Sequence, residues 1–298
     1  MRTSVLRPPR KTLDAGFLQV GSLRVHHTHG GRGSPVLFIH GLGSSGYIEW
    51  RFNLGAASER HRVYAPDLPG FGRSEKPRVR YGIPYFTRFI ERYMEKSGLR
   101  SAAVVGTSLG GRIALELALE SPGLVRKLVL VNALGLGRPN LRVSYGLMTI
   151  PRLGEALMNV ARDALHWAPS HVIRRVAGRY TGASSDLTRT MDDAYLDNLR
   201  ELYGAQGYHD AYLATVRSLV TPNALFGQHD MSKRLNELRV PVQLIWGADD
   251  PLFPIAHAAR AHALIPNSRL AIIEGAGHTP QAERPQEFNR VLGKFLDA

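Results

Sequence analysis

Four short runs of apolar residues limit most strongly what this chain can fold into. They read PVLFIH, AAVVG, KLVLVN and VQLIW, and they begin at Pro35, Ala102, Lys127 and Val242. Strands that are apolar on both sides are typical of a mostly parallel sheet whose two faces are covered by helices. The runs therefore predict an α/β fold with a deeply buried sheet.

Eight strands are expected in all, and helical patterns alternate with the later ones. The strands are expected at Gly16–Val20, Leu23–Thr28, Val36–His40, Arg62–Pro66, Ala102–Gly106, Lys127–Asn132, Val242–Trp246 and Leu270–Glu274. The helices between them include Pro84–Ser97, Leu109–Glu120, Ile255–Ala263 and Pro285–Leu296. This order predicts one mostly parallel eight-stranded sheet with helices on both faces.

One long interval departs from this alternation. Between the third and fourth apolar runs, no segment resembles a strand. In Arg152–Trp167, apolar residues recur at steps of three to five residues, as on one face of a helix. Because ligands bind outside the carboxyl ends of parallel strands, we expect residues 134–238 to form a helical insertion there, within a core of residues 1–133 and 239–298. Extra helices on the flank of the sheet are the alternative.

The chain has 298 residues, of which 44% are hydrophobic, and a formal net charge of +13. This length fits one large domain or a core with an insertion. A basic chain could bind nucleic acid or anionic membranes, but here the basic residues are scattered, and the one dense cluster is Arg7, Arg10 and Lys11. We therefore interpret the charge as a solvated, arginine-rich surface and expect no nucleic-acid partner.

The sequence lacks a long apolar run, a signal-peptide pattern and cysteine, and each absence limits where the protein can act or which chemistry it can use. No run approaches the roughly 18 apolar residues that cross a bilayer, so we expect no membrane span. The segment Met1–Lys11 is basic and lacks the apolar run of a signal peptide, which favours a cytoplasmic protein. The absence of cysteine excludes disulfides, cysteine-ligated zinc and a thiol nucleophile.

The segment Gly106–Gly110 reads GTSLG and follows one of the apolar runs directly. A serine on a sharp turn from a strand into a helix presents its hydroxyl above the sheet, and such a turn leaves no room for side chains two positions away. The positive end of the following helix points to the same place. Ser108 is therefore the predicted nucleophile.

A serine hydroxyl needs a neighbouring base to react at neutral pH. His278 is the best candidate, because it lies in a glycine-rich loop that follows the strand expected at Leu270–Glu274. His40 also ends a strand, and we assign it to the architecture of the turn. His26, His27 and His29 could form a metal site, but no acidic residue is near them in the sequence.

The base in turn needs a carboxylate to orient it and to stabilise its cation. Asp249 and Asp250 both follow the run that begins at Val242, and their spacing does not separate them. The end of the neighbouring strand would be another suitable place, but Asn132 occupies it and cannot carry the charge.

Two backbone amides are expected to bind the oxyanion that forms during acyl transfer. One is the amide of Leu109, directly after the serine. The second requires a loop with little side-chain bulk close to the nucleophile. The segment His40-Gly41-Leu42-Gly43 fits this requirement, and we nominate the amide of Leu42.

Taken together, these motifs resemble those of the α/β-hydrolase superfamily along almost the whole chain. HGLG at 40–43 resembles the oxyanion loop, DLPGFGRS at 67–74 the loop after the next strand, GTSLGG at 106–111 the nucleophile elbow, GADDPLFP at 247–254 the acid loop, and GAGHTPQAERP at 275–285 the histidine loop. The order serine, aspartate, histidine also matches this family.

The resemblance refines the predicted site. The usual acid loop has its aspartate four residues before a proline, which selects Asp250, four before Pro254, over Asp249. The insertion at 134–238 falls where the family has its helical cap. The implied catalytic residues are Ser108, Asp250 and His278, and no cofactor or metal is expected. The cap should set specificity, and candidates for its pocket wall are Trp50, Tyr145, Met148 and Trp167.

The identity of the nucleophile implies the kind of reaction. Haloalkane dehalogenases and epoxide hydrolases of this superfamily carry aspartate at the elbow, whereas serine members mainly hydrolyse carboxylic esters. We therefore expect an esterase that acts on a small-molecule ester, with a possible homodimer as its assembly.

Three alternatives remain at this point. A C–C bond hydrolase for meta-cleavage products would share the scaffold, but such enzymes usually carry smaller residues in the oxyanion loop than Leu42 and asparagine in place of Thr107. Perhydrolases often lack a long cap. A catalytically silent receptor on this scaffold would normally lose one of the three catalytic residues.

Overall fold

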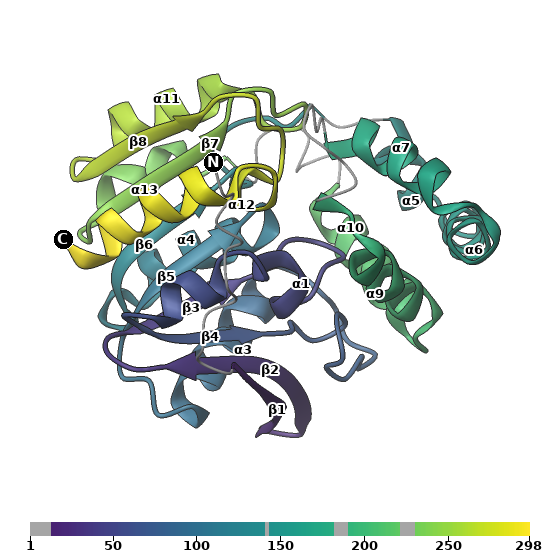
Figure 1. Ribbon diagram of the computed structural model, residues 1–298, viewed down its shortest axis with the longest axis horizontal. Coiled ribbons are helices and arrows are strands. Elements are labelled where there is room, and N and C mark those ends of the chain that lie inside the picture. The colour runs from purple at the N-terminus through teal and green to yellow at the C-terminus, as the bar shows by residue number, and fades with distance from the viewer. Residues whose placement is uncertain (1–12, 141–142, 182–189, 221–229) are drawn as a thin grey trace, which may run out of the picture.

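In the computed structural model, described for residues 13–140, 143–181, 190–220 and 230–298, the chain forms one eight-stranded sheet (Figure 1). The order in space is β1-β2-β4-β3-β5-β6-β7-β8. The strands from β4 to β8 in this order are parallel, and β1 and β2 join them in antiparallel pairs. The predicted α/β sheet is confirmed, while the tail expected at Met1–Lys11 lies outside the described residues.

Each predicted strand is present, with small shifts at its ends. The strands are β1 (Asp14–Val20), β2 (Leu23–Gly31), β3 (Pro35–Ile39), β4 (Arg62–Pro66), β5 (Ala102–Thr107), β6 (Val125–Val131), β7 (Val242–Gly247) and β8 (Ser268–Ile273). The largest extension is in β2, which continues to Gly31. A Cβ atom at Gly31 would lie 2.2 Å from the carbonyl oxygen of His61, so glycine allows the close approach of the two chain segments there.

Alternate residues of the parallel strands pack into two separate apolar clusters. In β3, Leu37 and Ile39 belong to the cluster that contains α3 (Ile83–Lys96), α4 (Leu109–Glu120) and α11 (Ile255–Leu264). Val36 and Phe38 point to the other face, which is covered by α1 (Gly46–Trp50), α2 (Leu54–Ser58) and α13 (Pro285–Asp297). The short helix α12 (Pro280–Glu283) contacts α1, α13 and β7. Both faces of β3 and β5 are buried, which is why these central strands contain almost no polar residues.

The interval between β6 and β7 is helical, as predicted. Its described helices are α5 (Val143–Thr149), α6 (Leu153–Trp167), α7 (Ser170–Thr181), α9 (Asp193–Gly204) and α10 (Tyr208–Leu219), followed by the short 3-10 helix η3 (Ser232–Glu237). Figure 1 shows α5 to α10, from teal to green, grouped beside the sheet. The division into a core and a cap at 134–238 stays a prediction.

The buried side of α6 differs from the face expected from its apolar spacing. Gly154, Met158 and Leu165 are buried, whereas Val160 is 65% exposed and Trp167 is 81% exposed. The reason is that α6 contacts its neighbours along one narrow side, so the helical period alone does not show which apolar residues are covered. No described helix is both long and apolar enough to cross a bilayer.

Candidate active site

Ser108 lies on the turn between β5 and α4 in a strained backbone conformation, with φ 51° and ψ −116°. Few residues other than glycine adopt a positive φ, and the surrounding contacts must maintain it. The Ser108 amide donates to the carbonyl of Val131 at 3.0 Å. A Cβ at Gly106 would lie 2.3 Å from the carbonyl oxygen of Gly110, and one at Gly110 would lie 2.3 Å from that of Ile39. Both glycines are therefore required, as the sequence predicts.

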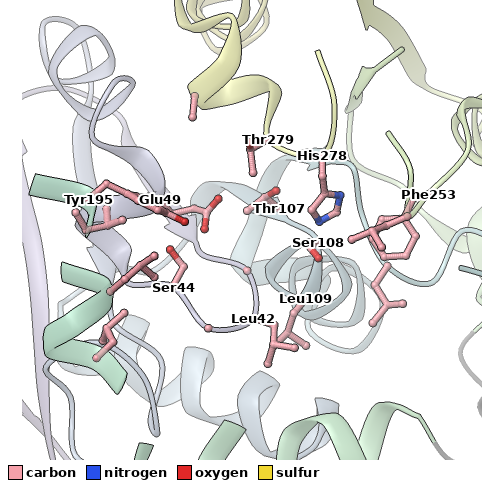
Figure 2. A pocket seen from close by; sticks show the side chains of 18 of the residues that line it. Leu42, Ser44, Glu49, Thr107, Ser108, Leu109, Tyr195, Phe253, His278 and Thr279 are labelled. Carbon is pink, nitrogen blue, oxygen red and sulfur yellow. The ribbon is translucent and has the colours of Figure 1, made fainter. Parts of the chain in front are cut away.

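His278 lies in the loop between β8 and α12, and its imidazole is held from one side by a carboxylate. Its Nδ1 is 2.9 Å from Oδ2 of Asp250. The Asp250 side chain is fully buried, and that of His278 is 12% exposed. Ser108 and His278 line the same pocket, and Figure 2 shows the imidazole and the serine side chain facing each other. The structure thus brings together all three predicted catalytic side chains.

The two neighbouring aspartates differ sharply in their surroundings. Asp250 is buried, and its Oδ1 accepts hydrogen bonds from the amides of Leu252 at 2.8 Å and Phe253 at 3.2 Å. Asp249 is exposed, and its amide bonds to the carbonyl of Ala276. Asp250, and not Asp249, contacts the imidazole.

The electrostatics of this pair favour a charged imidazole. Burial disfavours the charge, but the carboxylate of Asp250 and its hydrogen bond outweigh burial and raise the pKa of His278, and Glu49 and Glu283 act in the same direction. Burial likewise disfavours charge on Asp250, yet the imidazole and the hydrogen bonds from Leu252 and Asn132 lower the pKa of Asp250. The carboxylate of Asp250 therefore stabilises the positive charge that His278 acquires when it accepts a proton.

The loop nominated for the oxyanion passes directly beside the nucleophile. A Cβ at Gly41 would lie 3.4 Å from Cβ of Ser108. Leu42 lines the same pocket, and so does Leu109, the first residue of α4. The buried His40 fixes the start of this loop, because its Nδ1 is 2.7 Å from the carbonyl oxygen of Gly41.

The other nitrogen of His40 defines the protonation of that ring. Its Nε2 is 2.9 Å from the backbone amide of Leu68, which can only donate, so Nε2 accepts and Nδ1 carries the hydrogen. Burial lowers the pKa of His40, which keeps the ring neutral. His40 is thus part of the turn, as expected from the sequence.

The pocket above Ser108 has a volume of about 280 Å³. Its wall combines the loops after β3, β5, β7 and β8 with residues of α9 and α10, among them Tyr195, Leu199, Val216 and Leu219. Of the four aromatic and methionine candidates, only Tyr145 lines it. Trp50 is instead fully buried between the sheet and α13, near Phe38 and Phe288, and Trp167 is exposed. The sequence pattern could not separate these roles, because each is a large apolar residue.

Known proteins are similar to this chain in sequence and fold. The profile of the alpha/beta hydrolase fold family matches residues 34–285. The chain belongs to this family. It is 32% identical over 270 residues to an uncharacterized protein of Mycobacterium tuberculosis, with 90% of this chain and 76% of that protein covered. It is 31% identical over 280 residues to a 2-hydroxy-6-oxononadienedioate/2-hydroxy-6-oxononatrienedioate hydrolase of Cupriavidus pinatubonensis, with 92% and 90% covered.

A solved structure agrees with this assignment. The meta-cleavage product hydrolase of Pseudomonas fluorescens IP01 superposes with a TM-score of 0.75 at 23% identity, covering 95% of this chain and 97% of that one. The predicted superfamily and fold are therefore confirmed, and the protein is an α/β-hydrolase enzyme.

Two further residues of this α/β-hydrolase site were missed from the sequence. Asn132, at the end of β6, has φ 40° and is fully buried. Its Nδ2 donates to Oδ2 of Asp250 and, at 3.3 Å, to the carbonyl of Gly277, while its Oδ1 accepts from the amide of Gly247 at 3.0 Å. From the sequence, this position is assessed only as a place for a carboxylate. Its position at the end of a strand next to the one that carries the acid loop could have indicated that Asn132 helps to orient Asp250.

Glu283 is the second missed residue, and it holds the loop on both sides of His278. Its buried carboxylate accepts from the amide of Gly277 at 2.9 Å and from the amide and the hydroxyl of Thr279, both at 3.0 Å. In the sequence, Glu283 resembles an ordinary helix carboxylate, so no local pattern indicated this role.

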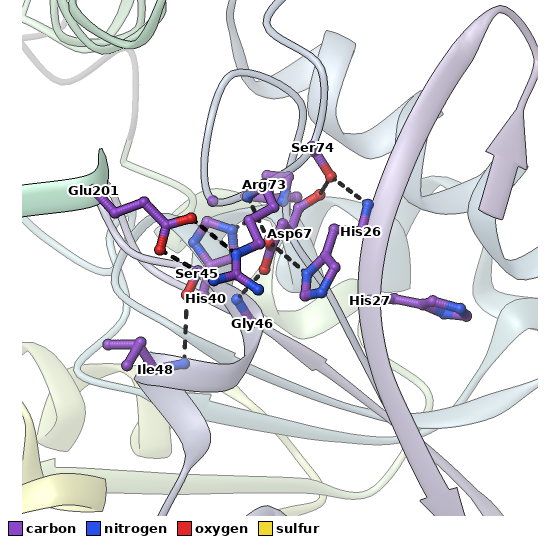
Figure 3. Close-up of polar contacts among 12 residues, drawn as sticks. His26, His27, His40, Ser45, Gly46, Ile48, Asp67, Arg73, Ser74 and Glu201 are labelled. Atoms are coloured by element: carbon purple, nitrogen blue, oxygen red, sulfur yellow. Dashed lines mark hydrogen bonds and ion pairs between the residues drawn. The ribbon is translucent and has the colours of Figure 1, made fainter. Parts of the chain in front are cut away.

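The histidines of β2 have partners other than a metal. Nδ1 of His26 is 3.0 Å from Oδ2 of Asp67 (Figure 3), so an acidic partner exists in space although none is near in the sequence. Nδ1 of His27 is 2.7 Å from the hydroxyl of Tyr93, and burial together with the neighbouring His29 and His26 lowers the pKa of His27 to about 4. Among the described residues, no group of three or more potential ligands is arranged to hold a metal ion.

Proposed function

We propose that this α/β-hydrolase cleaves carboxylic esters by way of an acyl-enzyme intermediate. The observation that carries the proposal is the position of His278, held by a buried carboxylate on one side and facing the hydroxyl of a strained serine on the other. This arrangement can move one proton from Ser108 to the imidazole and stabilise the resulting cation.

Acylation begins when Oγ of Ser108 attacks the ester carbonyl carbon. Nε2 of His278 takes the hydroxyl proton, and Asp250 stabilises the imidazolium. The carbonyl oxygen becomes an oxyanion, which we assign to the amides of Leu42 and Leu109. Each such donor contributes about 3–4 kcal/mol to transition-state stabilisation. His278 then gives its proton to the leaving alcohol as the C–O bond breaks.

Deacylation repeats these steps with water. His278 removes a proton from a water molecule, which attacks the acyl carbon. The second tetrahedral intermediate collapses to the free acid as Oγ of Ser108 leaves and recovers its proton from His278. The cycle thus needs no group beyond these side chains, the two amides and water.

Hydrolysis of p-nitrophenyl acetate and butyrate tests the proposal. The wild-type protein should release p-nitrophenolate with both esters, and a fluorophosphonate probe should label Ser108. Ser108→Ala should lose both properties, whereas Ser101→Ala, a serine outside the pocket, should retain them. Undiminished turnover by Ser108→Ala would overturn the assignment.

A C–C bond hydrolase is the second candidate, because the relative from Cupriavidus pinatubonensis is named for hydrolysis of a dienedioate. The reaction would use the same three side chains. Leu42 and Thr107, which both line the pocket, disfavour this candidate. C–C bond hydrolases of this kind usually carry smaller residues than Leu42 in the oxyanion loop and asparagine in place of Thr107. Rapid loss of colour from a meta-cleavage dienoate, with negligible ester hydrolysis, would favour this candidate.

Three expectations accompany the proposal. We infer that residues 134–238 act as a cap that sets specificity, since α9 and α10 contribute to the pocket wall. A cytoplasmic location and a possible homodimer stay predictions. Sedimentation equilibrium of the purified full chain would test the homodimer.

A further inference from the structure

The pocket wall contains one acidic side chain that the proposed mechanism does not use. Glu49 belongs to α1 and lines the pocket together with Ser44, Thr107 and Ser108. Figure 2 shows its carboxylate on the side of Ser108 and His278 opposite Phe253. The pocket thus has a polar side at Glu49 and an aromatic side at Phe253.

A hydrogen bond from a buried glutamine fixes the Glu49 carboxylate. Its Oε1 accepts from Nε2 of Gln281 at 2.6 Å. Gln281 is itself fully buried, and its backbone carbonyl accepts from the side chain of Asn53 at 3.1 Å. No described residue donates to the other oxygen, Oε2, which leaves it available to a ligand in the pocket. A fixed carboxylate with one available oxygen is suited to receive a positive charge.

The negative charge of Glu49 acts electrostatically on the imidazole of His278. Burial and Asp250 have the largest effects on the pKa of His278, and Glu49 is the next contributor, raising it further. An electrostatic effect that reaches the imidazole also reaches a substrate bound beside Ser108.

Arg51, the other permanently charged residue of the pocket wall, is bound mainly by groups other than Glu49, although Glu49 also stabilises its charge. Its guanidinium donates to the carbonyls of Ile48 at 2.8 Å and Thr190 at 2.6 Å and lies 3.8 Å from Oδ1 of Asp192. It also lies over the ring of Phe52, 4.3 Å from the centroid. Protein groups therefore occupy both terminal nitrogens and one face of the guanidinium, Nε has no partner among the described residues, and Asp192 is the counter-charge that pairs with it.

We propose that Glu49 binds a cationic group of the ester substrate, with the apolar part of the substrate against Phe253. This inference rests on the proposed ester hydrolysis and deepens it by naming a substrate class. It also implies discrimination against substrates with an additional carboxylate, because two like charges would be brought together in a partly desolvated pocket.

Isosteric ester pairs test this inference, because each pair differs only by nitrogen or carbon at one centre. Choline butyrate is paired with 3,3-dimethylbutyl butyrate, which places the charge in the alcohol. Methyl 4-(trimethylammonio)butyrate is paired with methyl 5,5-dimethylhexanoate, which places it in the acyl group. The measured quantity is the ratio of kcat/KM for the cationic ester to that for the neutral ester.

We expect the wild type to prefer the cationic member of at least one pair, and that pair identifies the arm of the substrate that reaches Glu49. In Glu49→Gln, this ratio should fall about tenfold. Glu59→Gln removes the same charge from an exposed residue outside the pocket and should leave the ratio unchanged. Equal ratios in Glu49→Gln and in the wild type, or a wild-type preference for both neutral esters, would overturn the inference.

Two further measurements separate the possible failures. Should Glu49→Gln not fold, the wild-type ratio must still fall as ionic strength increases, because salt screens the attraction. A ratio insensitive to salt then overturns the inference. If the wild type hydrolyses neither p-nitrophenyl butyrate nor any of the four esters, the proposed ester hydrolysis fails; if it hydrolyses p-nitrophenyl butyrate or the neutral esters but neither cationic ester, only the role of Glu49 fails.

Discussion

Asn132 and Asp250 form a buried hydrogen bond that joins the end of β6 to the loop after β7. The same oxygen of Asp250 contacts the imidazole of His278. Because Oδ1 of Asn132 accepts from the amide of Gly247, its Nδ2 is turned toward the Asp250 carboxylate and the carbonyl of Gly277. The carboxylate that orients the base is thus itself oriented by a residue of the neighbouring strand.

Asn132→Ala should therefore reduce both stability and ester hydrolysis. The free energy of unfolding should fall by about 1–3 kcal/mol, because the buried amide of Gly247 and an oxygen of Asp250 lose a partner. We expect kcat/KM for p-nitrophenyl butyrate to fall about tenfold, which corresponds to about 1.4 kcal/mol. Urea denaturation and initial rates measure the two effects. Asn267→Ala, at an exposed asparagine, is the control, and equal behaviour of the two variants would refute the positioning role.

The rate of ester hydrolysis should depend on pH through His278. The base must be neutral to accept a proton, so kcat/KM should rise with pH as the imidazole deprotonates. Since burial is outweighed by Asp250 and the pKa of His278 is raised, the midpoint of this rise should lie above pH 6.5. Rate profiles from pH 5 to 9 with a pH-insensitive neutral ester would show it.

Asp250→Asn tests the cause of that midpoint. The substitution removes the charge that raises the pKa of His278, so the midpoint should move to lower pH. At the same time, kcat should fall by about 10⁴, as expected when the orienting carboxylate is lost. Asp249→Asn, at the exposed neighbour, should change neither quantity. A larger loss in Asp249→Asn than in Asp250→Asn would reverse the assignment.

The sheet could be predicted from the sequence because its strands are apolar on both sides. Val36 and Leu37 pack into different clusters, so neither could be polar, and the run is recognisable without any alignment. The helical interval between β6 and β7 was recognisable for the opposite reason, since strand-like runs are absent from its sequence. Which face of α6 is buried could not be predicted, because its apolar residues are spread around the helix and Val160 remains exposed.

A site residue could be predicted where its own identity and the backbone conformation that it needs are both visible in the sequence. Ser108 needs glycine at two nearby positions, and both are visible in the sequence. Asp249 and Asp250 are adjacent and chemically identical, and only Asp250 is buried at the end of the strand. Its burial depends on how the following loop folds, which the sequence alone does not show. Asn132 and Glu283 act through hydrogen bonds to other loops, so their roles become visible only in the folded chain.

The two glycines of the elbow should differ from glycines that have space around them. In Gly110→Ala, the new Cβ would lie 2.3 Å from the carbonyl oxygen of Ile39, a backbone atom that cannot move alone. We expect a loss of about 1–3 kcal/mol in the free energy of unfolding and reduced labelling of Ser108. Gly123→Ala, where a Cβ would meet no atom within 4 Å, is the matched control. Equal thermal midpoints for both variants would show that the elbow tolerates a side chain.

Glu283→Gln should lower kcat more than it raises KM. The carboxylate accepts hydrogen bonds from the amides of Gly277 and Thr279, and a glutamine side chain would place an NH₂ group against one of these donors. The loop that carries His278 would then lose a buried acceptor, with a cost of about 1–3 kcal/mol in stability. Glu287→Gln, at a half-exposed glutamate of α13, provides the control. Because Glu283 does not line the pocket, substrate binding should be nearly unchanged, and an increase in KM alone would contradict a role through His278.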